Sequence, residues 1–148
     1  MSLLFIGSSQ IEQWPLPKTV AKCTKTGILT RDLFGLPLKK HAFSRIVLYC
    51  GSNDILAGLD PVDNIVKFVD RLRQAYPRSE ITVLGILKSP FAKKFHDVIT
   101  SVNTRLKRGL GPDIHFVNRN RVLMHPKYYR EDGLHLNEAG YDVWARAI

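Results

Sequence analysis

The sequence predicts an α/β fold, a three-layer α/β/α sandwich around a flavodoxin-like parallel sheet of about five strands. Short, continuous apolar runs alternate along the chain with segments in which apolar residues recur every three or four positions. Continuous apolar runs are typical of strands that are buried on both faces. Their alternation with helical segments is typical of a parallel sheet covered by helices.

Four apolar runs are expected to form the buried strands, namely Leu3–Ile6, Ile46–Tyr49, Ile81–Leu87 and Ile114–Val117. A fifth strand is expected near Thr19–Lys25, where the apolar pattern is weaker.

Three further segments carry the apolar period of an amphipathic helix. The first follows Pro61, a favoured first-turn residue, and its stripe consists of Ile65, Val66, Val69, Leu72 and Ala75. The second ends at Gly109, and its stripe consists of Phe95, Val98, Ile99, Val102 and Leu106. The third covers residues 138–148, with Asn137 placed to cap it.

The bulk composition is typical of one soluble globular domain over residues 1–148, with 45% hydrophobic and 24% charged residues. No stretch approaches the roughly 20 apolar residues of a membrane span. The apolar start lacks a basic leader and a cleavage site, so we expect a cytoplasmic protein, with a removed secretory leader left open. Cys23 and Cys50 form no CxxC motif and are expected to be buried apolar residues. No metal-ligand cluster and no cofactor motif is found, so no metal or cofactor is expected.

The formal net charge of +9 is unevenly distributed. Residues 85–130 contain ten basic residues and only two acidic ones, Asp97 and Asp113. The ten basic residues are Lys88, Lys93, Lys94, Arg105, Lys107, Arg108, Arg119, Arg121, Lys127 and Arg130. A basic stretch over residues 88–130 can attract an anionic substrate or surface. It can equally be a solvated face that aids solubility. The absence of interleaved aromatic residues argues against nucleic acid.

Polar residues follow two of the expected strands, at the edge of the sheet where ligands bind in parallel α/β folds. Gly7-Ser8-Ser9 follows the first strand, and a hydroxyl after such a turn can stand at the crevice. Asn53 follows the second strand and can donate a hydrogen bond there. Taken alone, the first is more often an ordinary turn and the second a helix cap or Asx-turn.

An Asp and a His lie three residues apart near the C-terminus, at Asp132 and His135, in a turn that contains Gly133. A carboxylate at this spacing can contact the imidazole, fix its tautomer and stabilise the imidazolium. The other histidines lack such a partner spacing and are expected to be surface or core residues; they are His41, His96, His115 and His125.

Together, these segments resemble the four blocks of the SGNH, or GDSL-type, hydrolases over residues 3–148. The matching positions are Phe5-Ile6-Gly7-Ser8-Ser9 with Trp14, then Gly27, then Tyr49-Cys50-Gly51-Ser52-Asn53-Asp54, and finally Asp132-Gly133-Leu134-His135-Leu136-Asn137 with Gly140 and Tyr141. The chain departs from the family pattern at Ser8, where an Asp is usual, which leaves two adjacent hydroxyls. It also departs in the second block, where Gly27 lacks the common preceding Asn and the second glycine.

The resemblance implies a Ser9–His135–Asp132 triad and an oxyanion hole made by the N–H groups of Ser9 and Gly27 and the amide of Asn53. It implies a serine esterase that acts on carboxylic esters through an acyl-enzyme. The short chain leaves little length for a lid, so we expect the substrate to be a small ester with a short acyl group. Two alternatives stay open. The chain can be an inactive binding module with the same fold, or a protein whose basic surface binds nucleic acid or anionic lipid.

Overall fold

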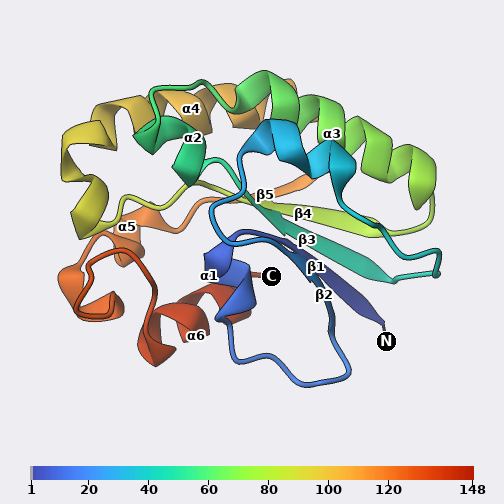
Figure 1. Ribbon diagram of the computed structural model, residues 1–148, viewed down its shortest axis with the longest axis horizontal. Helices are drawn as coiled ribbons and strands as arrows, with labels where there is room; N and C mark the ends of the chain where they lie inside the picture. The colour runs from blue at the N-terminus through green and yellow to red at the C-terminus, as the bar shows by residue number, and fades with distance from the viewer. Residues whose placement is uncertain (1) are drawn as a thin grey trace.

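A five-stranded, wholly parallel sheet forms the middle of the computed structural model, which describes residues 2–148 (Figure 1). Its strands are β1 (Leu3–Gly7), β2 (Ala21–Thr24), β3 (Arg45–Tyr49), β4 (Glu80–Leu84) and β5 (His115–Val117). They lie in the order β2-β1-β3-β4-β5. This is the flavodoxin-like order, in which the chain reverses direction across the sheet between β1 and β3.

Helices cover both faces of the sheet, which confirms the three-layer architecture (Figure 1). One face carries η1 (Thr30–Gly35), α3 (Val62–Ala75) and α4 (His96–Gly109), and the other carries α1 (Ser9–Glu12) and α6 (Glu138–Ala147). Successive strand residues point to opposite faces. Leu4 and Ile6 therefore join the core beneath α3 and α4, whereas Phe5 joins the core beneath α1 and α6.

An aromatic cluster beneath α1 and α6 joins the two ends of the chain. The Trp14 ring lies 5.4 Å from the Tyr141 ring and 5.5 Å from the Trp144 ring, between centroids. Phe5 contacts Trp14 edge-on at 5.2 Å, and Tyr49 lies 5.0 Å from Trp144. Buried aromatic pairs of this kind add about 0.5–1.5 kcal/mol each beyond their area, so the segment after α1 is held firmly against α6.

The helix predictions were correct in position, but three stripe residues were misplaced: Ala75 and Val98 are exposed, and Phe95 lies in η2 (Pro90–Phe95), before α4 begins. α3 begins after Pro61, α4 ends at Gly109, and the Asn137 side chain caps α6 by accepting from the Gly140 N–H at 3.0 Å. Val98, which we placed in the apolar stripe of α4, is 46% exposed. It lies one residue before the buried Ile99, so the stripe is narrower than the apolar pattern predicts.

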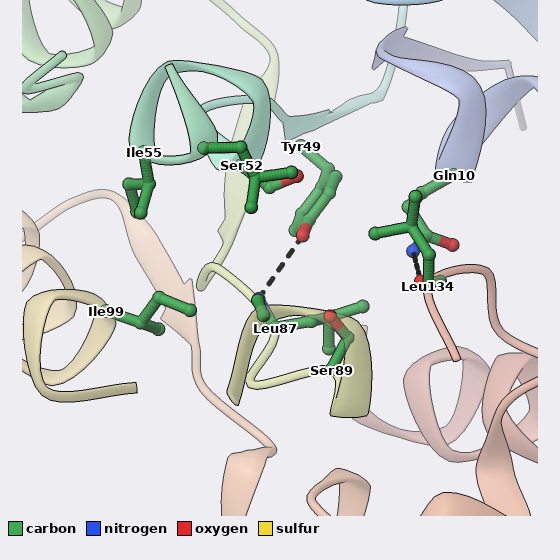
Figure 2. A pocket seen from close by; sticks show the side chains of 10 residues that line it. Gln10, Tyr49, Ser52, Ile55, Leu87, Ser89, Ile99 and Leu134 are labelled. Carbon is green, nitrogen blue, oxygen red and sulfur yellow. Dashed lines mark hydrogen bonds between the residues drawn. The ribbon is translucent and has the colours of Figure 1, made fainter. Parts of the chain in front are cut away.

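The predicted strand over residues 81–87 was too long, because β4 ends at Leu84. The Gly85 N–H still donates to the Val117 carbonyl of β5 at 2.7 Å, and beyond Gly85 side chains replace the strand partner. The N–H and carbonyl of Ile86 pair with Asn103 at 2.8 and 3.0 Å, and the Leu87 N–H donates to the Tyr49 hydroxyl at 3.2 Å (Figure 2). The backbone leaves the sheet here although it stays apolar and buried.

The remaining elements are short and lie near the carboxyl ends of the strands: α2 (Ser52–Leu56), η2 (Pro90–Phe95), α5 (Asn120–Leu123) and η3 (Pro126–Tyr128). Cys50 is buried and Cys23 half-buried, both thiols are free, and burial raises the pKa of each. Over residues 2–148, no helix has both the length and the apolar character needed to cross a membrane.

Candidate active site

The first part of the site is the turn that follows β1. Gly7 packs so closely against β3 that a Cβ built on it would lie 2.1 Å from the Tyr49 carbonyl oxygen. This close approach requires glycine, and it sets Ser9 at the start of α1, at the carboxyl edge of the sheet. The Ser9 N–H, in the first turn of α1, donates to no protein atom within residues 2–148.

The two adjacent serines have different surroundings. The Ser9 hydroxyl oxygen lies 2.9 Å from Nε2 of His135, across 126 residues of chain. Ser8 is buried and occupies the N-cap position of α1 without a side-chain capping bond, and its backbone N–H donates to the Tyr49 carbonyl at 3.4 Å. Only the Ser9 hydroxyl therefore faces the imidazole.

The second part of the site is the loop from Asp132 to His135. The Oδ2 atom of Asp132 lies 2.6 Å from Nδ1 of His135, and its Oδ1 atom accepts the backbone N–H groups of Leu134 and His135 at 2.9 and 3.0 Å. Gly133 permits this tight loop with a φ of +67°. Because Nδ1–H donates to the carboxylate, Nε2 is left to accept the Ser9 proton.

The hydrogen bonds to Asp132 keep its carboxyl group ionised. Burial raises the pKa of Asp132, but the bonds from the His135 ring and the two backbone N–H groups outweigh it and lower the pKa from 3.8 to about 2. The folded-state pKa is thus below the unfolded-state one. The stabilisation by these bonds is complete above the ordinary carboxyl pKa and is lost as pH falls toward 2. Asp132 therefore remains a carboxylate at neutral pH.

Asn53 and Gly27, the two residues predicted to line an oxyanion hole, belong to neighbouring segments. The Asn53 amide nitrogen donates to the carbonyl of Ile28 at 3.1 Å, beside Gly27. An amide nitrogen carries two hydrogens, so one stays available after this bond. Gly27 has a φ of +76° and is exposed, and its N–H has no protein acceptor among residues 2–148.

Asp54 has a structural role that we did not assign from the sequence, although it is part of the Asn53 block. Its side chain is buried and accepts the backbone N–H of Thr30 at 2.9 Å and the Thr30 hydroxyl at 2.6 Å. Asn64 donates to the same hydroxyl at 3.1 Å. These bonds attach the loop that contains Gly27 to α2 and α3. An acidic residue in a buried segment was the one sequence feature that could have indicated this.

A small apolar cavity lies beside these residues, shown in Figure 2. It has a volume of about 10 Å³, which is room for about one water molecule. Gln10 and Leu134, the neighbours of Ser9 and His135, form part of its wall, together with Tyr49, Ser52 and Leu87. The cavity therefore adjoins the site, and the segments that carry Ser9 and His135 each form part of its wall.

Part of the basic stretch lines a separate, polar cavity of about 320 Å³ on the α4 side. Lys88, Lys107 and Asn118 contribute to its wall, and no acidic residue does. This arrangement is compatible with the anionic partner expected from the sequence, which stays a prediction.

Comparisons with known proteins found similar folds among solved structures. No protein-family model matches the sequence, and no curated protein matches it. A solved structure of a Streptococcus pneumoniae protein named for platelet activating factor is 26% identical, with a TM-score of 0.83 over 98% of this chain and 80% of that one.

Two further solved structures agree over nearly their full length. A member of the lipolytic G-D-S-L family from Veillonella parvula is 18% identical, with a TM-score of 0.71 over 99% of this chain and 95% of that one. A family 3 carbohydrate esterase from Clostridium thermocellum is 17% identical, with a TM-score of 0.72 over 99% and 94%. At these identities the likeness concerns the fold.

Proposed function

From the premise that this chain has the fold of the SGNH, or GDSL-type, hydrolases, we propose that it is a serine esterase acting through Ser9, His135 and Asp132. The observation that carries the proposal is the hydrogen-bonded series from Ser9 to His135 (2.9 Å) and from His135 to Asp132 (2.6 Å). It lies next to the reversal of strand order between β1 and β3, where ligands bind in such sheets. Esterases among the similar solved structures support the reaction class.

In the proposed reaction, the Ser9 hydroxyl oxygen attacks the ester carbonyl while Nε2 of His135 takes its proton. The tetrahedral intermediate collapses, the bond to the leaving oxygen breaks, and His135 returns the proton to the departing alcohol. Water then attacks the acyl-enzyme by the same route, releasing the acid and restoring Ser9. Asp132 keeps Nδ1–H of His135 oriented and stabilises the imidazolium.

The developing negative charge on the carbonyl oxygen would be met by three donors, the N–H groups of Ser9 and Gly27 and the second amide hydrogen of Asn53. Two observations support this set. The N–H groups of Ser9 and Gly27 donate to no protein atom within residues 2–148, and the bond from Asn53 to Ile28 fixes the amide plane. The donors therefore need little rearrangement during the reaction.

Replacing Asn53 with alanine is expected to lower kcat for p-nitrophenyl acetate by roughly 10²–10³-fold with little change in KM, because the donor acts mainly on the transition state. Steady-state kinetics check this. Asn64→Ala is the matched control, since it removes an amide bonded to the same loop at Thr30; its kcat should stay near that of the wild type. A change confined to KM in Asn53→Ala would mean that Asn53 only binds substrate.

We further propose a preference for short acyl groups, because the cavity beside the site has room for only about one water molecule. A panel of p-nitrophenyl esters of increasing acyl length tests reaction and preference together. We expect kcat/KM to be highest for acetate and to fall steadily with length. A maximum at long acyl groups would contradict the preference. Labelling by a fluorophosphonate probe separates an esterase from an inactive binding module, because only an activated serine reacts.

A further inference from the structure

Gln10 connects the element that carries Ser9 to the loop that carries His135. It directly follows Ser9 in α1, and the residue is only 4% exposed. Its amide nitrogen donates to the Leu134 carbonyl at 2.6 Å (Figure 2), and its amide oxygen accepts the Leu136 N–H at 3.2 Å. One side chain thus pairs with the backbone on both sides of His135, much as a neighbouring strand would.

The backbone around His135 is held from two directions. Its own N–H donates to Asp132 at 3.0 Å, and its carbonyl accepts from the Arg130 N–H at 2.8 Å. Asp132 and Arg130 belong to the same loop as His135, and these two bonds lie within that loop. Gln10 belongs to α1, so its two bonds relate the position of the base to that of the nucleophile.

Glutamine suits this role for a chemical reason. A carboxamide offers a donor and an acceptor in a fixed plane, and the carbonyl of Leu134 and the N–H of Leu136 require one of each. Leu136 is fully buried, so an unpaired N–H there would cost about 1–3 kcal/mol. A leucine would satisfy neither group, and an ionised glutamate would satisfy only the N–H.

We propose that Gln10 is a positioning residue that holds His135 within hydrogen-bonding distance of Ser9. The proposal rests on the esterase function proposed above. The tyrosine hydroxyl of Tyr141 donates to the Gln10 carbonyl at 2.6 Å, so α1 is itself fixed on α6. Through its bonds to Leu134 and Leu136, Gln10 holds the His135 loop at a fixed distance from α1. A displacement of about 1 Å between reacting groups can cost about 10²-fold in rate.

The test compares Gln10→Leu with Asn103→Leu. Asn103 is a matched control because its buried carboxamide also pairs with a backbone N–H and a carbonyl, both of Ile86, away from Ser9 and His135. We expect Gln10→Leu to lower kcat for p-nitrophenyl acetate roughly 10–100-fold with KM changed by less than about threefold. Asn103→Leu should lower Tm by a similar amount while its kcat stays within about twofold of the wild type.

Two additions keep the outcome decisive. If Gln10→Leu does not fold, Gln10→Glu keeps the shape and the bond to Leu136, and we expect a smaller loss of kcat, about tenfold. A low-field proton NMR signal from His135 Nδ1–H, bonded to Asp132, gives a readout independent of turnover. It should persist in the wild type and in Asn103→Leu, and weaken or vanish in Gln10→Leu.

The two proposals fail in different ways. A wild type that neither hydrolyses esters nor reacts with a fluorophosphonate contradicts the esterase function, while the NMR signal still decides the role of Gln10. A folded Gln10 variant with kcat within about twofold of the wild type and an unchanged NMR signal overturns the positioning role. A loss of activity that only follows the loss of Tm in both Gln10→Leu and Asn103→Leu overturns it as well.

Discussion

Replacing Ser9 with alanine is expected to reduce kcat for p-nitrophenyl acetate by about 10⁴-fold or more. The change removes the atom that forms the acyl-enzyme and leaves Nε2 of His135 without its hydrogen-bond partner. Ser9 is only half-buried and its side chain is small, so the fold should remain and Tm should move by no more than a few degrees. Stopped-flow or steady-state assays with a thermal melt check both expectations.

Ser8→Ala is the control for this experiment, because it removes the adjacent hydroxyl, which belongs to a buried residue and makes no capping bond to α1. Ser8→Ala should retain most of the activity and still react with a fluorophosphonate probe. An active Ser9→Ala beside an inactive Ser8→Ala would show that the nucleophile is misassigned.

Replacing Gly7 with alanine is expected to destabilise the protein by about 3 kcal/mol or more. The added Cβ would lie 2.1 Å from the Tyr49 carbonyl oxygen and 2.8 Å from Cγ1 of Ile11. A backbone oxygen cannot rotate away as a side chain can, so β1 and β3 must separate at the point where Ser9 is positioned. Urea unfolding followed by circular dichroism measures the loss.

Gly35→Ala serves as its matched control. A Cβ at Gly35 meets no atom within 4 Å, and its φ lies outside the left-handed region. The substitution should leave stability unchanged or raise it by up to about 1 kcal/mol, because alanine restricts the unfolded chain. Equal losses from Gly7→Ala and Gly35→Ala would mean that the contact with Tyr49 is not the cause.

The fold was predictable because its elements have simple periodicities. The buried strands read as continuous apolar runs, and the helices after Pro61 and Asn137 begin with recognisable first-turn and capping residues. The pair Asp132 and His135 was likewise local in sequence, three residues apart, so its contact could be anticipated.

The contacts of Gln10 and Asp54 could not be predicted in this way. Each joins a side chain to backbone groups far along the chain, 124 residues away for Gln10 and Leu134 and 24 for Asp54 and Thr30. Such bonds leave no period in the sequence. The end of β4 was missed for the same reason. Beyond it, the side chain of Asn103 takes the place of a neighbouring strand, and the pattern of apolar residues does not show this change of partner.

The separation of Ser9 and His135 by 126 residues has a consequence for how activity is acquired. Along the chain the nucleophile precedes its base, so a nascent chain that has not yet reached His135 lacks a complete site. Closing so long a loop adds little to the entropic cost, since each doubling of length adds only about 0.6 kcal/mol, but contacts of high sequence separation form slowly. Turnover would then begin only when the segment after α1 meets α6 through the aromatic cluster, so the recovery of activity during refolding would report on global folding.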